Sequence, residues 1–178
     1  MEQITRLTTK KICIGALLLA AGILLPQLFH AVGGPAAGGM LLPMHIPVLL
    51  AGMLLGPSYG LLLGMVTPLF SFLASGMPPL AKLPFMLLEL TAYGALAGIS
   101  LPWGWKGAYL RLFLAQAGGR FVYALALAAA VYILGLDVPP VASVWTAVLT
   151  GIPGILLQWI LIPPLCRLLQ RSLRLGGN

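Results

Sequence analysis

One acidic residue stands inside an apolar segment that is long enough to cross a lipid bilayer. Glu89 lies in the sequence Leu-Leu-Glu-Leu-Thr-Ala-Tyr, and the whole chain has only three acidic residues. A charged side chain at mid-membrane costs about 2.5–3.5 kcal/mol on insertion scales. Such a residue usually faces a polar cavity or a charged partner, and it often marks the path of a substrate or ion. Glu89 is therefore the first candidate for a functional residue.

A cation is expected at a similar depth on the next apolar segment. At 1.5 Å per residue, Glu89 should lie roughly 10–12 Å below one membrane surface, and Arg120 roughly 17 Å above the other, in a core of about 30 Å. Thr150, on the last apolar segment, is expected near the same level. Further polar residues extend these helix faces at helical spacing: Lys82 and Tyr93 around Glu89, Gln116 and Tyr123 around Arg120, and Thr146 before Thr150.

These positions predict a polar pocket that is open to the outside of the cell. The candidate substrate-binding residues are His45, Lys82, Glu89, Tyr93, Arg120, Tyr123 and Thr150. Alternatively, Glu89 and Arg120 form an ion pair that only joins two helices. His30 and His45 could equally be interfacial anchors, and Thr67, Ser71 and Ser75 are more typical of helix packing than of ligand contact.

The composition favours an all-α integral membrane protein. Of the 178 residues, 60% are hydrophobic and 7% are charged, whereas soluble domains carry about 25% charged residues. The apolar stretches are continuous rather than alternating, which indicates helices and not a barrel. We expect one domain, residues 1–178, and a single bundle of six transmembrane helices. Their approximate ranges are 12–31, 40–55, 59–75, 81–101, 108–134 and 142–165.

The remaining segments are expected to be loops or ends. Residues 32–39 are expected to form a glycine-rich loop, Trp103-Gly104-Trp105-Lys106 an interfacial turn, and residues 167–178 a basic tail. Pro43 and Pro47 should make the outer half of the second helix irregular.

The positive charges set the orientation. Eight cations are expected on the side of the two termini: Arg6, Lys10, Lys11, Lys106, Arg111, Arg167, Arg171 and Arg174. Only Lys82 falls near the opposite face. By the positive-inside rule both termini should be cytoplasmic, and the loops at 32–39, 76–81 and 135–141 should face outward. The net charge of +7 is thus explained by topology, without a nucleic-acid partner.

Several chemistries have no motif in this chain. We find no Walker A sequence, no His-Glu-x-x-His and no Cys-x-x-Cys. Two histidines and two cysteines, Cys13 and Cys166, suggest neither a metal site nor a disulfide framework. We therefore expect no cofactor, no metal and no enzymatic activity.

The first predicted helix carries a face of small residues. Ala16 and Ala20 follow the small-xxx-small spacing that lets another helix approach closely. This face could dock on a separate transmembrane partner or pack within the bundle.

The order of several short segments resembles the substrate-binding S components of energy-coupling factor (ECF) vitamin transporters. The matching segments are 42–52, the turn 56–60, residues 75–78, residues 89–94 and the pair Gly119-Arg120. The resemblance implies a multi-pass protein of the prokaryotic plasma membrane that captures a vitamin or a vitamin precursor from outside. It also implies a transmembrane T component and two ABC-type ATPases as partners, with ATP hydrolysis on those chains. In the family, the Ala16 and Ala20 pattern would dock on the T component.

Two other functions remain open at this point. A solitary gradient-driven carrier or channel is disfavoured because titratable groups are few and no inverted repeat is visible. A membrane scaffold would make the Glu89–Arg120 pair purely structural. The substrate also stays open between pantothenate, which carries a carboxylate, and a neutral pyrimidine or ribazole-type precursor.

Overall fold

The computed structural model describes residues 2–101 and 104–173, with side chains described for 9–34, 36–101 and 104–172. Trp103, Arg174 and the side chain of Arg6, which entered the predictions above, lie outside this part.

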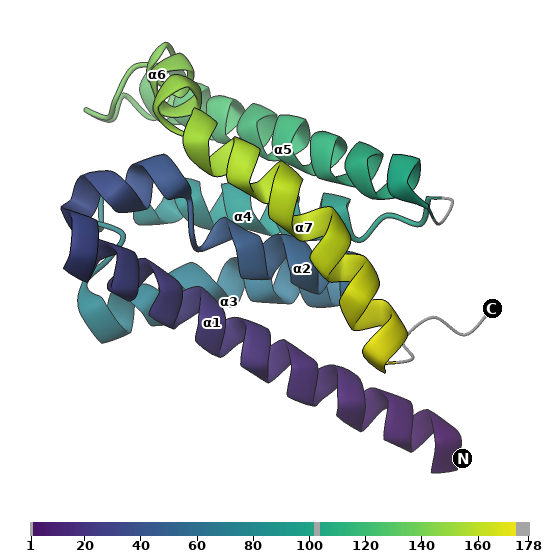
Figure 1. Cartoon of the computed structure of the whole chain (residues 1–178). Coiled ribbons are helices and arrows are strands. Elements are labelled where there is room, and N and C mark those ends of the chain that lie inside the picture. Colours follow the sequence, from purple (N-terminus) through teal and green to yellow (C-terminus); the bar gives the residue numbers. More distant parts are fainter. Residues whose placement is uncertain (1, 102–103, 174–178) are drawn as a thin grey trace.

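The described chain is all-helical, as predicted, and contains no strand (Figure 1). Its elements are α1 (Glu2–Leu41), α2 (His45–Leu55), α3 (Pro57–Ser75), α4 (Leu83–Ala97), α5 (Trp105–Ala128), the π-helical turn η1 (Ala129–Ile133), α6 (Ser143–Thr150) and α7 (Ile152–Leu173).

Five helical segments are long and apolar enough to cross a membrane. They are Thr9–Gly34, Ala36–Leu55, Pro57–Ser75, Trp105–Ile133 and Ile152–Ser172. The helix that carries Glu89, Leu83–Ala97, is apolar but shorter.

The predicted glycine-rich loop at 32–39 is wrong, because the backbone stays helical there. Helix α1 continues to Leu41, with a kink at Gly34, whose φ of 69° and ψ of −174° are not helical. Pro35 follows directly, and proline suits the first position of a helix because its φ is already fixed. Two helical segments therefore meet at Gly34 without a connecting loop, and the chain breaks instead at Leu42, before α2.

The last predicted helix, 142–165, is divided and extended in the structure. It breaks at Gly151 into α6 and α7, and α7 then runs to Leu173, so residues 167–173 are helix and not tail. Pro153 lies in the first turn of α7, where its missing N–H removes no helical hydrogen bond. Pro163 and Pro164 lie inside α7 without ending it.

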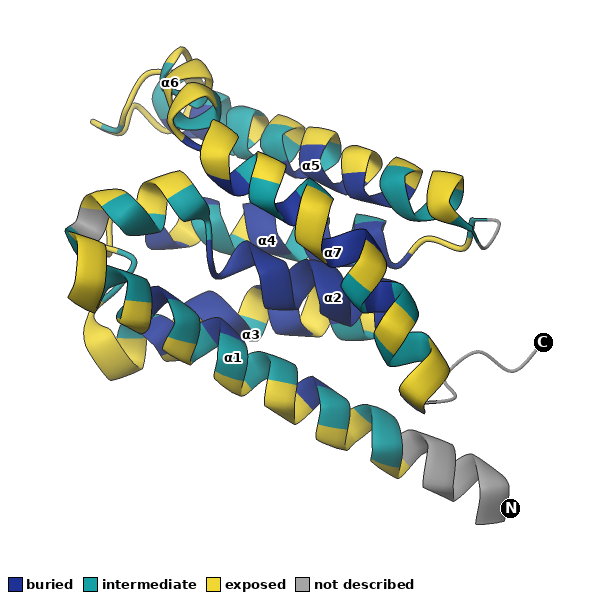
Figure 2. Ribbon diagram, in the orientation of Figure 1, coloured by how far each residue is buried: buried dark blue, intermediate teal, exposed yellow. Residues whose placement is uncertain are grey.

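Helix α2 is the centre of the bundle. All eleven of its residues are buried, and Figure 2 shows it enclosed by the other helices. Most of its apolar side chains form one core cluster with residues of α4, α5 and α7, among them Tyr93, Leu112 and Ile162.

Close backbone contact joins α3 to α4. A Cβ added to Gly94 would lie 2.0 Å from the carbonyl oxygen of Gly60, and one added to Gly60 would lie 2.1 Å from that of Gly94. Membrane helices use small residues in this way, because their association depends on packing rather than on exclusion of water. This contact holds α4, and with it Glu89, in a fixed position.

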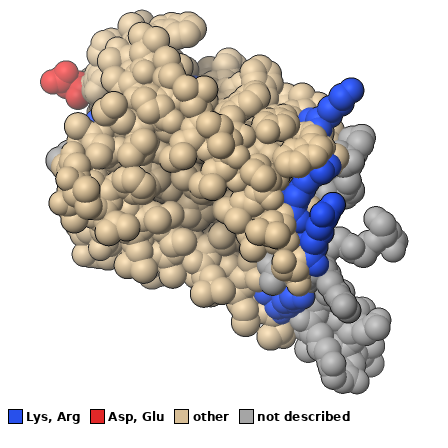
Figure 3. Space-filling model, viewed as in Figure 1, with Lys and Arg blue, Asp and Glu red and all other residues tan. Residues whose placement is uncertain are grey.

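The two ends of the bundle differ in charge. Figure 3 shows most of the visible Lys and Arg side chains gathered at the end that carries both termini, and the visible acidic side chain at the opposite end. This separation agrees with the charge distribution on which the predicted orientation rests.

Candidate binding site

The structure brings Glu89 and Arg120 into direct contact. The Nη1 atom of Arg120 lies 2.9 Å from Oε1 of Glu89, and the two side chains are 14% and 6% exposed. Helix α4 supplies the carboxylate and α5 supplies the guanidinium. The depth match predicted from helix rise therefore corresponds to a real ion pair.

This ion pair leaves hydrogen-bonding capacity unused. Although the two atoms are close, the contact lacks the directed geometry of a hydrogen bond. Glu89 Oε1 and the Nε and Nη2 atoms of Arg120 are buried without a hydrogen-bond partner. A buried polar atom without a hydrogen-bond partner costs about 1–3 kcal/mol of stability. A ligand that forms hydrogen bonds with these atoms would therefore remove part of this cost.

A cavity of about 400 Å³ lies against the pair. Glu89, Arg120 and Tyr123 line it from α4 and α5, and Ser143, Thr146, Ala147 and Thr150 line it from α6. His45, Lys82 and Met86 complete the wall, together with Gly39, Leu42 and Pro139. Residues of α1, α2, α4, α5 and α6 thus surround the cavity, at the end of the bundle opposite the termini.

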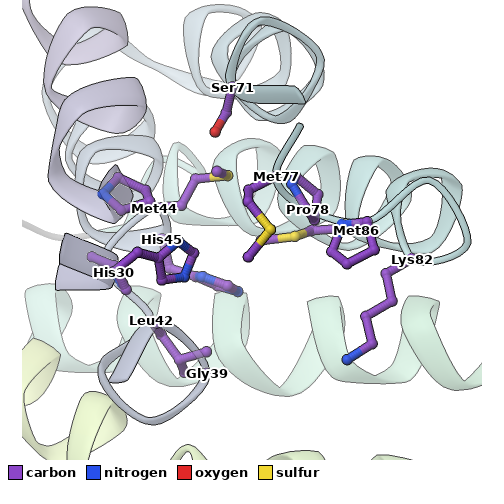
Figure 4. A pocket seen from close by; sticks show the side chains of 14 residues that line it. His30, Gly39, Leu42, Met44, His45, Ser71, Met77, Pro78, Lys82 and Met86 are labelled. Atoms are coloured by element: carbon purple, nitrogen blue, oxygen red, sulfur yellow. The ribbon is translucent and has the colours of Figure 1, made fainter. Parts of the chain in front are cut away.

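A second cavity of about 240 Å³ adjoins the first. The two share Gly39, Leu42, His45, Lys82 and Met86. The second cavity adds His30 from α1, Met44, Ser71 from α3, Met77 and a group of prolines (Figure 4). Because the two cavities adjoin, we treat them as two lobes of one cavity. The first, which the ion pair lines, is called the polar lobe, and the second is called the methionine lobe. Methionine side chains adapt their shape readily, so the second lobe suits an apolar group of irregular outline.

Six of the seven candidate residues line the polar lobe, and Tyr93 lies behind it. The ring of Tyr93 is 1% exposed and packs edge-on against the ring of His45, with centroids 5.0 Å apart. Both ring nitrogens of His45 are buried without a partner. Tyr93 thus positions His45 and does not itself reach the cavity.

Hydrogen bonding differs between the two α6 hydroxyl residues. The Thr150 hydroxyl donates to the carbonyl oxygen of Thr146 at 2.8 Å, so its proton is already used. The Ser143 hydroxyl is buried without a partner. Ser143 was missed in the sequence because it lies at the start of a helix that was predicted as one long span, where a serine is an ordinary residue.

A family comparison gives this arrangement a context. The model of the family described as ECF transporter, substrate-specific component, matches residues 10–166. The chain belongs to this family. The substrate-specific component is a subunit of a transporter and not an enzyme, and its members are membrane proteins, as the apolar helices of this chain require. No curated protein and no solved structure shows a significant match.

The small-residue face of this ECF component lies on the outside of the bundle. Ala16 and Ala20 are exposed on α1, whereas Gly15 and Gly22 are buried against α2 and α3. The alternative that Ala16 and Ala20 pack inside the bundle does not hold. The face is open to lipid or to another protein.

Gln116, which shares a helix face with Arg120, contributes to packing rather than to the cavity. Its Nε2 donates to Oε1 of Gln158 at 2.9 Å, and its Oε1 accepts from Nε1 of Trp159 at 2.6 Å. These bonds join α5 to α7 on the termini side of the ion pair. Gln116 lines neither lobe of the cavity.

Proposed function

We propose that this ECF substrate-specific component captures a vitamin or vitamin precursor from outside the cell in the two-lobed cavity. The observation that carries the proposal is a buried ion pair that lines a cavity and keeps unpaired polar atoms there. Buried ion pairs contribute little stability, because desolvation offsets their attraction. A charged pair beside a cavity in a membrane protein is therefore better explained by a role in substrate binding than by a contribution to stability.

The topology that suits this function has six membrane crossings in a single domain. The short helix α4 would be the sixth crossing, beside the five segments that are long enough on their own. The cation-rich end would then face the cytoplasm, and the cavity would open to the outside.

The charges of the cavity favour a ligand with one negative group. Glu89 and Arg120 offset each other, and Lys82 leaves the lining of the polar lobe with an excess of one positive charge. A carboxylate could approach Lys82 and the free nitrogens of Arg120, while an apolar part enters the methionine lobe.

Mass spectrometry of the ligand that co-purifies with the chain tests this function. The protein purified alone should retain a small metabolite, and should transport nothing by itself in liposomes. Transport by the chain alone in a gradient would identify a carrier instead. A protein that neither retains nor transports a metabolite would be a scaffold.

We further propose that the exposed face at Ala16 and Ala20 docks on a T component, which works with two ATPases. Ala16→Trp should abolish uptake in cells while the purified protein still retains its ligand, because a bulky side chain prevents close helix contact without reaching the cavity. Unchanged uptake would show that the face only contacts lipid.

A further inference from the structure

A separate, basic pocket lies at the end of the bundle that carries the termini. It has a volume of about 240 Å³ and lies between the start of α5 and the end of α7. Arg111, Arg167 and Arg171 line it, together with Gln170 and Cys166. The described acidic side chains, Glu89 and Asp137, do not line it. Three cations therefore meet in a hollow whose described wall contains no acidic residue.

Two of these arginines are held in place by their neighbours. Arg111 is 5% exposed, and its Nη2 donates to the carbonyl oxygen of Leu101. The guanidinium of Arg167 stacks over the ring of Trp105, 4.2 Å from the centroid. Because their positions are fixed before any ligand arrives, these side chains lose little freedom on binding an anion.

We expect the pocket to lie near the level where a membrane meets water. Arg111 is six residues from the start of α5 and Arg167 six residues from the end of α7, which is about 9 Å along each axis. Trp105, which is 48% exposed, is of the type that gathers at the headgroup level.

An exposed apolar stripe runs along α7 towards the pocket. Ile160 and Leu168 are 72% and 61% exposed, and Arg171 continues the same face one turn beyond Leu168. An acyl chain on this stripe would place its headgroup at Arg171.

We propose that this pocket binds the phosphate headgroup of an anionic phospholipid. Arginine is suited to phosphate, because its planar fork donates two hydrogen bonds to two oxygens. Basic pockets between transmembrane helices are known as sites for anionic headgroups. The site is distinct from the cavity beside Glu89, and it does not depend on which metabolite that cavity takes.

The thermal stability of the full chain in detergent tests the proposal. Short-chain phosphatidylglycerol should raise the unfolding midpoint. Phosphatidylcholine with the same chains, and inorganic phosphate, should not. Arg171→Gln should weaken the apparent affinity for phosphatidylglycerol about fivefold, and Arg167→Gln with Arg171→Gln about 25-fold, at about 1 kcal/mol per cation.

The control is Lys11→Gln, which removes the same charge at the same end of the molecule but outside the pocket. Lys11→Gln should keep the wild-type affinity. Equal losses in Lys11→Gln and Arg171→Gln would overturn the site, and equal stabilisation by inorganic phosphate would overturn its assignment to a lipid. Should the double variant fail to fold, Arg171→Gln decides alone, because its side chain is exposed.

Discussion

Removing one partner of the Glu89–Arg120 pair should destabilise the protein strongly. In Arg120→Gln, the carboxylate of Glu89, which is 6% exposed, would lose the positive charge that it faces. In Glu89→Gln, the guanidinium of Arg120 would lose the negative charge that it faces. Breaking a buried pair in this way costs about 3–5 kcal/mol. That is a large part of the roughly 5–15 kcal/mol that holds a typical domain together.

The double variant, Glu89→Gln with Arg120→Gln, separates stability from binding. It contains no uncompensated charge, so it should be more stable than the sum of the single effects implies, by about 0.5–3 kcal/mol. It should still fail to retain the ligand, because both members of the ion pair that lines the polar lobe are gone and only the charge of Lys82 remains.

The assay measures two quantities on each purified variant: the unfolding midpoint in detergent, and the amount of retained metabolite per chain by mass spectrometry. Leu88→Ala, on the exposed side of the same helix, is the control and should retain the ligand. The reasoning is refuted if the double variant recovers both stability and ligand, since the pair would then only join α4 to α5.

Two further predictions concern packing and topology. Gly94→Ala should reduce folded yield sharply, because its Cβ would lie 2.0 Å from the Gly60 carbonyl oxygen. Gly15→Ala should fold normally, because its Cβ would meet the Leu55 side chain at an ordinary contact distance of 3.7 Å. Equal yields would show that α3 and α4 can separate. In a cysteine-free background on intact cells, a cysteine at Asp137 should react with an impermeant maleimide and one at Lys106 should not, and the reverse pattern would invert the proposed orientation.

The Glu89–Arg120 pair could be predicted from the sequence, because a charged residue in a membrane-spanning segment is rare and usually has a function. Glu89 and Arg120 are conspicuous in apolar segments, and a constant helix rise places them at one depth. Helix rise also predicted the depth of Thr150, and helical spacing placed Lys82 on the same face as Glu89; both residues line the cavity.

The sequence did not predict the details that depend on local backbone geometry. The kink at Gly34 depends on one residue, because a glycine can adopt its positive φ without a connecting loop. The break at Gly151 lies two residues before Pro153, which has no N–H to continue the helix. The methionine lobe was missed because Met44 and Met77 are apolar residues among many. Only their convergence from separate segments distinguishes them.

The most direct test of ligand capture in the cavity is to fill it. Ala147 lines the polar lobe, whereas Leu149, on the same helix, is 64% exposed on its outer side. Retained metabolite per chain, measured by mass spectrometry on the purified protein, should be the same in wild type and Leu149→Trp and should be nearly absent in Ala147→Trp. Full retention by a folded Ala147→Trp variant would contradict the account, because the ligand would then bind elsewhere.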